Sequence, residues 1–95
     1  MTQAFVIDYR RGPAWLDRKS VFKQPLQGHL AYMRTLQGQG TLVLGGPFLD
    51  DTGGLIVVKA EGVAQAEALM RADPAVQDGV MVAEAHPWKL MAGSL

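Results

Sequence analysis

The chain has 95 residues, a formal net charge of zero, no cysteine and 48% hydrophobic residues. This length suits one domain, which we expect to span residues 1–95, and the balance of nine basic and nine acidic residues excludes a strong global attraction to nucleic acid or to an acidic membrane. The absence of cysteine excludes a disulfide framework, a thiolate nucleophile and a Cys-ligated metal.

The first half of the chain predicts a strand, a helix and a second strand. Residues 3–9 (QAFVIDY) are rich in Val, Ile and aromatic side chains, which favour strands, and the RRGP sequence that follows is expected to end the strand. Residues 14–24 show no clean period and predict a loop or a short irregular helix. Pro25 suits the first turn of a helix that runs to Gly38, with one apolar face made by Leu26, Leu30, Met33 and Leu36. Residues 41–45 (TLVLG) predict the second strand, which the next Gly-Pro pair stops.

The second half of the chain again alternates strands and helices. Residues 48–54 (FLDDTGG) contain turn-forming residues and lead into a third strand over 55–60. A second helix is expected over 63–72, and the Asp-Pro pair that follows breaks it before one short turn over 74–77. Residues 80–86 (VMVAEAH) predict the fourth strand.

These elements follow the order β-α-β-β-α-β, which predicts a ferredoxin-like α+β fold with a four-stranded antiparallel sheet. Two helices can cover one face of such a sheet, so the strands should be polar on the other face. The runs Phe5–Ile7, Leu42–Leu44 and Leu55–Val58 are instead apolar at every position. We therefore expect a homodimer with its sheets packed face to face, the arrangement called a dimeric α+β barrel. The alternative is that residues 10–24 and the tail, expected to be loose over 90–95, cover the open face within one chain.

The start of the chain lacks a basic segment followed by an apolar run, so no export signal is expected. No stretch approaches the roughly 18 apolar residues of a membrane span. We therefore expect a soluble, cytoplasmic protein that binds neither membranes nor nucleic acid.

His29 is one of only two histidines and is the first candidate for acid–base chemistry. It lies in the expected first helix, three residues after Leu26 and four before Met33, and so sits beside the apolar face. A neutral, partly shielded imidazole in such a place is a usable general base near pH 7. The alternative is a boundary histidine that packs and makes a single hydrogen bond.

Asp73 has two interpretations. It precedes Pro74 and so suits the N-cap of the short turn that follows. It also suits a carboxylate that orients His29 by accepting its ring N–H, since both residues lie on helical segments expected to cover the same sheet face. The sequence does not show whether the two side chains meet.

The remaining polar groups carry weaker signals. Glu84 and His86 share one face of the fourth strand, either as a polar pair in a cleft or as the solvent side of the strand end. Asp50 and Asp51 precede Thr-Gly-Gly and fit a turn better than a carboxylate pair. The two histidines are not spaced as metal ligands, and neither GxxxxGK[ST] nor GxGxxG occurs, so we expect no metal and no cofactor. Close approach of a ligand to the backbone is possible at Gly45, Gly46 and Pro47.

Taken together, the sequence resembles the YciI-like proteins, which consist of a YCII-related domain. The resemblance spans residues 3–89, and the segments that carry it are, in order, FVIDY, HLAYMRTLQGQGTLVLGGPF, GGLIVVKAEG, AEALMRADPAVQDGV and HPWK. Its most diagnostic parts are His29 with Leu30, the GGP at 45–47, and Ala72-Asp73-Pro74 followed by Gly79.

The resemblance implies a ferredoxin-like fold assembled as a dimeric α+β barrel, with an active site built around a His–Asp pair, here His29 and Asp73. One activity in this family is the dehydrochlorination of a chlorinated hydroxyquinol, a proton-transfer and elimination chemistry that suits such a pair. We therefore expect a small organic substrate in a pocket shaped by the glycines and proline at 45–47. Aromatic walls for a small ring, which core packing would explain equally well, are available from Trp15, Phe22 and Trp88.

Two other functions fit the same residues. One is a non-catalytic binding or interaction module, in which His29 only anchors a ligand. The other is a haem-linked monooxygenase of the wider class of dimeric barrels, with His29 as axial ligand.

Overall fold

The computed structural model describes residues 2–94, which form one antiparallel sheet and a set of short helices. The elements are, in chain order, β1 (Gln3–Arg11), the 3₁₀-helix η1 (Val21–Lys23), α1 (Gln27–Gly38), β2 (Leu42–Pro47), β3 (Gly53–Ala60), α2 (Val63–Arg71), α3 (Pro74–Gln77) and β4 (Met81–Trp88). The strands lie in the order β2-β3-β1-β4, and every neighbouring pair is antiparallel. The predicted ferredoxin-like α+β fold is thereby confirmed.

Several element boundaries differ from the predicted ones by one or more residues, and three of these differences have a clear structural basis. β1 continues to Arg11, because its last two residues still pair with β4. Pro47 is the last residue of β2 instead of a stop before it, and proline is tolerated there because β2 is an edge strand. Pro25 does not lie in the first turn of α1, since the helix begins at Gln27 with Leu26 as its N-cap.

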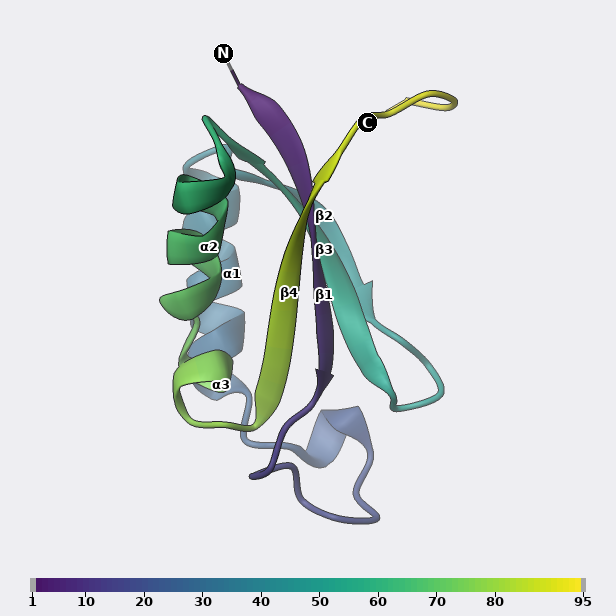
Figure 1. The fold of residues 1–95 in the computed structure, drawn as a ribbon. Coiled ribbons are helices and arrows are strands. Elements are labelled where there is room, and N and C mark those ends of the chain that lie inside the picture. The colour runs from purple at the N-terminus through teal and green to yellow at the C-terminus, as the bar shows by residue number, and fades with distance from the viewer. Residues whose placement is uncertain (1, 95) are drawn as a thin grey trace.

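The core lies between the sheet and the helices, and β1 shows how the sequence builds it. Phe5, Ile7 and Tyr9 are at most 2% exposed, whereas Val6 and Asp8 between them are half-buried. This alternation is that of a strand with one covered face. Figure 1 shows α1, α2 and α3 on one side of the sheet. The odd-numbered side chains of β1 therefore face the helices, and Tyr9 stands near the end of the strand.

The second face of the sheet has no helix over it among residues 2–94 (Figure 1). Val6 pairs with Val57 and points away from the helices, and Leu55, two residues from Val57 on β3, lies on the same face. Glu84 and His86 of β4 add polar side chains to this face. The tail after β4 runs away from the sheet, and the loop before α1 lies beyond its end (Figure 1). The open face is thus apolar over β3 and carries both polar and apolar side chains over β4.

A buried glutamine holds the loop between β1 and α1 in shape. Gln24 is 6% exposed, and its side-chain oxygen accepts the Leu16 N–H at 2.7 Å. Its side-chain nitrogen donates to the carbonyls of Leu16 at 3.0 Å and Lys19 at 3.1 Å. These contacts satisfy a polar group that burial would otherwise penalise. They also fix η1 at the end of the sheet near Tyr9.

None of the helices in the described part of the chain is long and apolar enough to cross a membrane.

Candidate active site

Asp73 occupies the short connection between α2 and α3, and its local sequence explains its conformation. Its backbone is extended, with φ −69° and ψ 122°, and Pro74 takes the first helical position of α3. One carboxylate oxygen, Oδ1, accepts the backbone N–H of Ala75 at 2.9 Å. The predicted N-cap is therefore present, and it uses only one of the two oxygens of a side chain that is fully buried.

The second oxygen of Asp73 meets His29. The distance between His29 Nδ1 and Asp73 Oδ2 is 2.6 Å, and the imidazole is 13% exposed. His29 stands in the first turn of α1, directly after Gly28. A Cβ at Gly28 would lie 2.9 Å from Cβ of Pro74, so the missing side chain allows α1 to approach α3 this closely. The structure therefore answers the question that the sequence leaves open: the two side chains meet.

A third side chain, which the sequence does not single out, completes the group. The Tyr9 hydroxyl donates to Asp73 Oδ2 at 2.8 Å, and the Tyr9 and His29 rings pack edge to face with their centroids 5.4 Å apart. Tyr9 is separated from Asp73 by 64 residues and reads in the sequence only as an aromatic strand residue. No local pattern connects the two, and only the alternation along β1 indicates that Tyr9 faces the helices.

The charges of the group fix where the protons lie. Burial raises the pKa of Asp73, but the hydrogen bond from His29, the charge of His29, the Ala75 N–H and the Tyr9 hydroxyl together outweigh it and hold this pKa below its usual value. Burial, followed by the charge of Asp73, raises the pKa of the Tyr9 hydroxyl, which stays protonated.

These protonation states assign the tautomer of His29. An ionised carboxylate only accepts hydrogen bonds, so Nδ1 of His29 must carry a proton and donate a hydrogen bond to Asp73. In the neutral ring Nε2 then holds a free lone pair. Every buried side-chain nitrogen or oxygen among residues 2–94 has a hydrogen-bond partner. Nε2 of His29 has no such partner among these residues, so this atom is not buried and is accessible. Nε2, the basic nitrogen of the neutral ring, thus faces away from Asp73.

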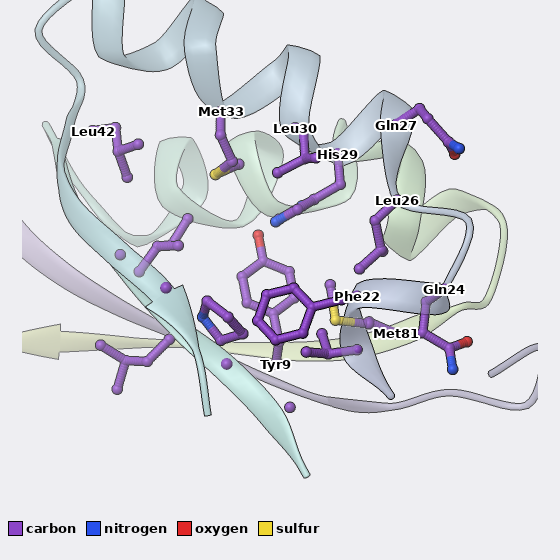
Figure 2. A pocket seen from close by; sticks show the side chains of 18 residues that line it. Tyr9, Phe22, Gln24, Leu26, Gln27, His29, Leu30, Met33, Leu42 and Met81 are labelled. Atoms are coloured by element: carbon purple, nitrogen blue, oxygen red, sulfur yellow. The ribbon is translucent and has the colours of Figure 1, made fainter. Parts of the chain in front are cut away.

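His29 opens onto a pocket of about 440 Å³ between α1, η1 and the strand ends, within the usual range for a small-molecule site (Figure 2). Leu30 and Met33 of α1 and Met81 of β4 give it an apolar lining. None of the described lining residues is Asp, Glu, Lys or Arg. Such a cavity suits an uncharged, mainly apolar molecule.

The structure brings most of the predicted binding residues to this pocket. Phe22, which is 75% exposed, stands beside it with the glycines and proline of β2. Four of the five predicted positions thus line the pocket: Phe22, Gly45, Gly46 and Pro47. The fifth predicted position, Trp15, does not line this pocket. Its ring packs against the core and under the Arg11 guanidinium at 5.6 Å, because the loop fixed by Gln24 turns it toward a separate polar depression of about 190 Å³.

The other polar groups weighed in the sequence lie elsewhere. Glu84 and His86 are exposed, with Oε2 and Nε2 3.6 Å apart, on the face of the sheet away from the pocket. Asp50 accepts from Thr52 in the turn before β3, as its sequence context predicts. Residues 2–94 contain no group of three or more His, Asp or Glu side chains that could hold a metal ion.

Comparison with known proteins identifies the family. The sequence model of the YCII-related domain matches residues 5–89. The chain belongs to this family. The match includes Tyr9, His29 and Asp73.

One sequence relative and one solved structure are similar to this chain. The uncharacterized protein YjpA of Bacillus subtilis (strain 168) is 34% identical over 68 residues, which are 72% of this chain and 80% of YjpA. The 5-chloro-2-hydroxyhydroquinone dehydrochlorinase TftG of Burkholderia phenoliruptrix AC1100, solved in complex with 2,5-dihydroxybenzoquinone, superimposes with a TM-score of 0.65. That match covers 90% of this chain and 93% of TftG at 22% sequence identity, so it shows a shared fold.

Proposed function

We propose that this YCII-domain protein is an acid–base catalyst that acts on a small, uncharged, largely apolar molecule such as a hydroxylated aromatic ring. The observation that carries the proposal is the imidazole of His29, which is bound at Nδ1 to a buried carboxylate 2.6 Å away and leaves Nε2 free beside an apolar pocket. A histidine held in this way has the tautomer that a general base requires.

In the proposed reaction, His29 Nε2 takes up a proton from the substrate. Asp73 keeps the ring in one orientation and stabilises the imidazolium that forms, and it stays ionised itself. Elimination, isomerisation and hydrolysis all need such a proton transfer. For a dehydrochlorination, the electron pair released by proton removal expels chloride, so that one H⁺ and one Cl⁻ leave together. TftG, which shares this fold, is a dehydrochlorinase of a chlorinated ring, and this supports testing the same class of compound here.

The decisive assay compares two site variants with a matched control. His29→Ala and Asp73→Asn are each tested for chloride release and product absorbance with a panel of chlorinated and hydroxylated aromatics that includes 5-chloro-2-hydroxyhydroquinone. The control is His86→Ala, because His86 is exposed on the opposite sheet face. We expect a loss of activity of about 10²–10⁴-fold in the first two variants and none in the control. Activity that survives both changes would refute the pair as the catalyst.

A binding module is the competing function, and the same proteins separate it from catalysis. Saturable binding of 2,5-dihydroxybenzoquinone without turnover of any compound in the panel would favour the module. A Soret band on titration with haem would point to His29 as an axial ligand instead.

We also propose that the open sheet face joins two copies of this chain. The apolar side chains over β3 support it, because a sheet face of this kind needs a cover. The test is the mass in solution of Leu44→Lys, since Leu44 pairs with Val57 on that face and is 48% exposed. Leu49→Lys is the control, because Leu49 lies in the loop after β2 and is 88% exposed. A dimer that persists in Leu44→Lys contradicts this interface.

A further inference from the structure

We propose that Tyr9 is a positioning residue that tunes how readily His29 takes up a proton, by donating its hydroxyl to the carboxylate oxygen that also receives the His29 ring N–H. This role rests on the proposed acid–base function of His29. In it, the Tyr9 hydroxyl acts through Asp73 and does not contact the substrate.

The geometry places both donors on one atom. Asp73 Oδ2 lies 2.6 Å from His29 Nδ1 and 2.8 Å from the Tyr9 hydroxyl, while Oδ1 is occupied by the Ala75 N–H at 2.9 Å. The carboxylate is fully buried and Tyr9 is 2% exposed, so water does not compete for these positions. Hydrogen bonds of a neutral donor to a buried charge are among the stronger ones in proteins.

The sign of the effect follows from electrostatics. The O–H dipole of Tyr9 points its positive end at Oδ2, so it stabilises the carboxylate and spreads its negative charge. Because the same charge holds the imidazolium form of His29, a stronger Tyr9 hydrogen bond weakens that hold. Removal of the hydroxyl therefore favours the protonated ring, and a more acidic phenol at this position disfavours it.

Few other titratable groups face the pair. Tyr32 of α1 is close enough for the charge of Asp73 to raise the pKa of its hydroxyl, after the larger effect of burial, but that hydroxyl donates to the Leu69 carbonyl at 2.7 Å. No charged side chain lines the pocket among the described residues. Asp8 of β1 and Glu84 of β4 lie opposite each other in the strand register, and both project from the opposite sheet face. Tyr9 is thus the group that can tune the pair.

Two other roles for Tyr9 fit the structure less well. As a proton donor to the substrate, it would have to leave a carboxylate to which its proton is already committed, and burial beside that charge raises the pKa of its hydroxyl. As a purely structural group, it would contribute to stability without changing the proton affinity of His29. An experiment must therefore distinguish a purely structural Tyr9 from one that changes the proton affinity of His29.

The experiment is an NMR titration of the His29 ring Cε1–H, which is readily resolved because the chain has only two histidines. In Tyr9→Phe we expect the pH of half-protonation of His29 to rise by about half a pH unit or more, because one hydrogen bond to a charged acceptor is lost. Tyr32→Phe is the matched control and should leave the titration unchanged.

A second variant gives the opposite sign. In the Tyr32→Phe background Tyr9 is the sole tyrosine, so biosynthetic incorporation of 3-fluorotyrosine changes this one phenol and makes it more acidic. The half-protonation of His29 should then move to lower pH, a response that loss of packing cannot mimic. Opposite shifts support the tuning role, whereas an unchanged His29 titration in both proteins overturns it.

The titration needs no substrate, so it also separates this inference from the proposed function. If no compound is turned over but the two shifts occur, the tuning stands and catalysis fails. If His29→Ala abolishes turnover but the shifts are absent, catalysis stands and Tyr9 is structural.

Discussion

Gly28→Ala tests whether the approach of α1 to α3 builds the site. Alanine is favoured over glycine in a helix interior by about 1 kcal/mol. At this position, however, the new Cβ would lie 2.9 Å from Cβ of Pro74, a rigid ring atom. Helix α1 must then withdraw by about 0.5 Å to reach ordinary contact. Because His29 is the next residue, that movement lengthens its 2.6 Å contact with Asp73.

Gly38→Ala is the matched control, because Gly38 belongs to the same helix and a Cβ there meets nothing within 4 Å. We expect the control to be stabilised by about 0.5–1 kcal/mol through helix propensity. In Gly28→Ala that gain is offset by an overpacking penalty of about 1–3 kcal/mol. The two variants should therefore differ by about 1–3 kcal/mol in the free energy of unfolding.

Urea denaturation of both variants measures this difference, and the NMR signal of the His29 Nδ1–H reports the hydrogen bond to Asp73. We expect that signal to shift upfield in Gly28→Ala as the bond weakens and to stay in place in Gly38→Ala. Equal stabilisation of the two variants, with the His29 signal unchanged, would refute the idea that the missing side chain at Gly28 sets the spacing.

Three further predictions follow from the same contacts. Asp73→Asn should lose stability near pH 7 by about 2–4 kcal/mol, and its difference from the wild type should shrink as the pH falls below about 4. The sign follows because the pKa of Asp73 is lower in the folded protein than in the unfolded chain. The contribution of Asp73 to stability is therefore complete above the unfolded-state pKa and is lost as the pH falls through the folded-state pKa. Urea titrations across pH 2–7 measure this loss. Gln24→Ala should increase amide exchange in the loop before α1 and lower the midpoint of thermal unfolding, because it leaves the polar groups of Leu16 without partners. Phe22→Ala should change stability by less than about 0.5 kcal/mol, since Phe22 is 75% exposed, but weaken 2,5-dihydroxybenzoquinone binding in calorimetry if the ring walls the pocket.

The fold is predictable from the sequence because its signals are local. The apolar runs, the glycine-rich turns and the Asp-Pro pair each act within a few residues, and they give the order of strands and helices that the structure shows. The errors arise where tertiary pairing overrides these local signals. Pro47 reads as a stop, yet it ends a paired edge strand, and Pro25 reads as helical, yet it precedes the helix by two residues.

The site is only partly predictable, because its geometry is non-local. His29 and Asp73 can be nominated by residue type and position, but their contact depends on how α1 packs against α3. Gly28 carries a signal for that packing, which the sequence alone presents as a slightly weakened helix. Tyr9 carries none, since a tyrosine on a buried strand face is most simply a core residue.

The carboxylate of Asp73 joins the structural and the chemical requirements of this fold in one side chain. Its Oδ1 caps α3, a task that Ser, Thr or Asn would perform about as well. Its Oδ2 accepts hydrogen bonds from two side chains, of β1 and α1, and only an ionised carboxylate can accept both of these while its other oxygen still caps α3. The cap therefore explains why a polar residue precedes Pro74, but it does not explain why that residue is an acid. The choice of aspartate follows from the partners at Oδ2, which is why the proton position on His29, and not the stability of α3, is the property that reveals what Asp73 does.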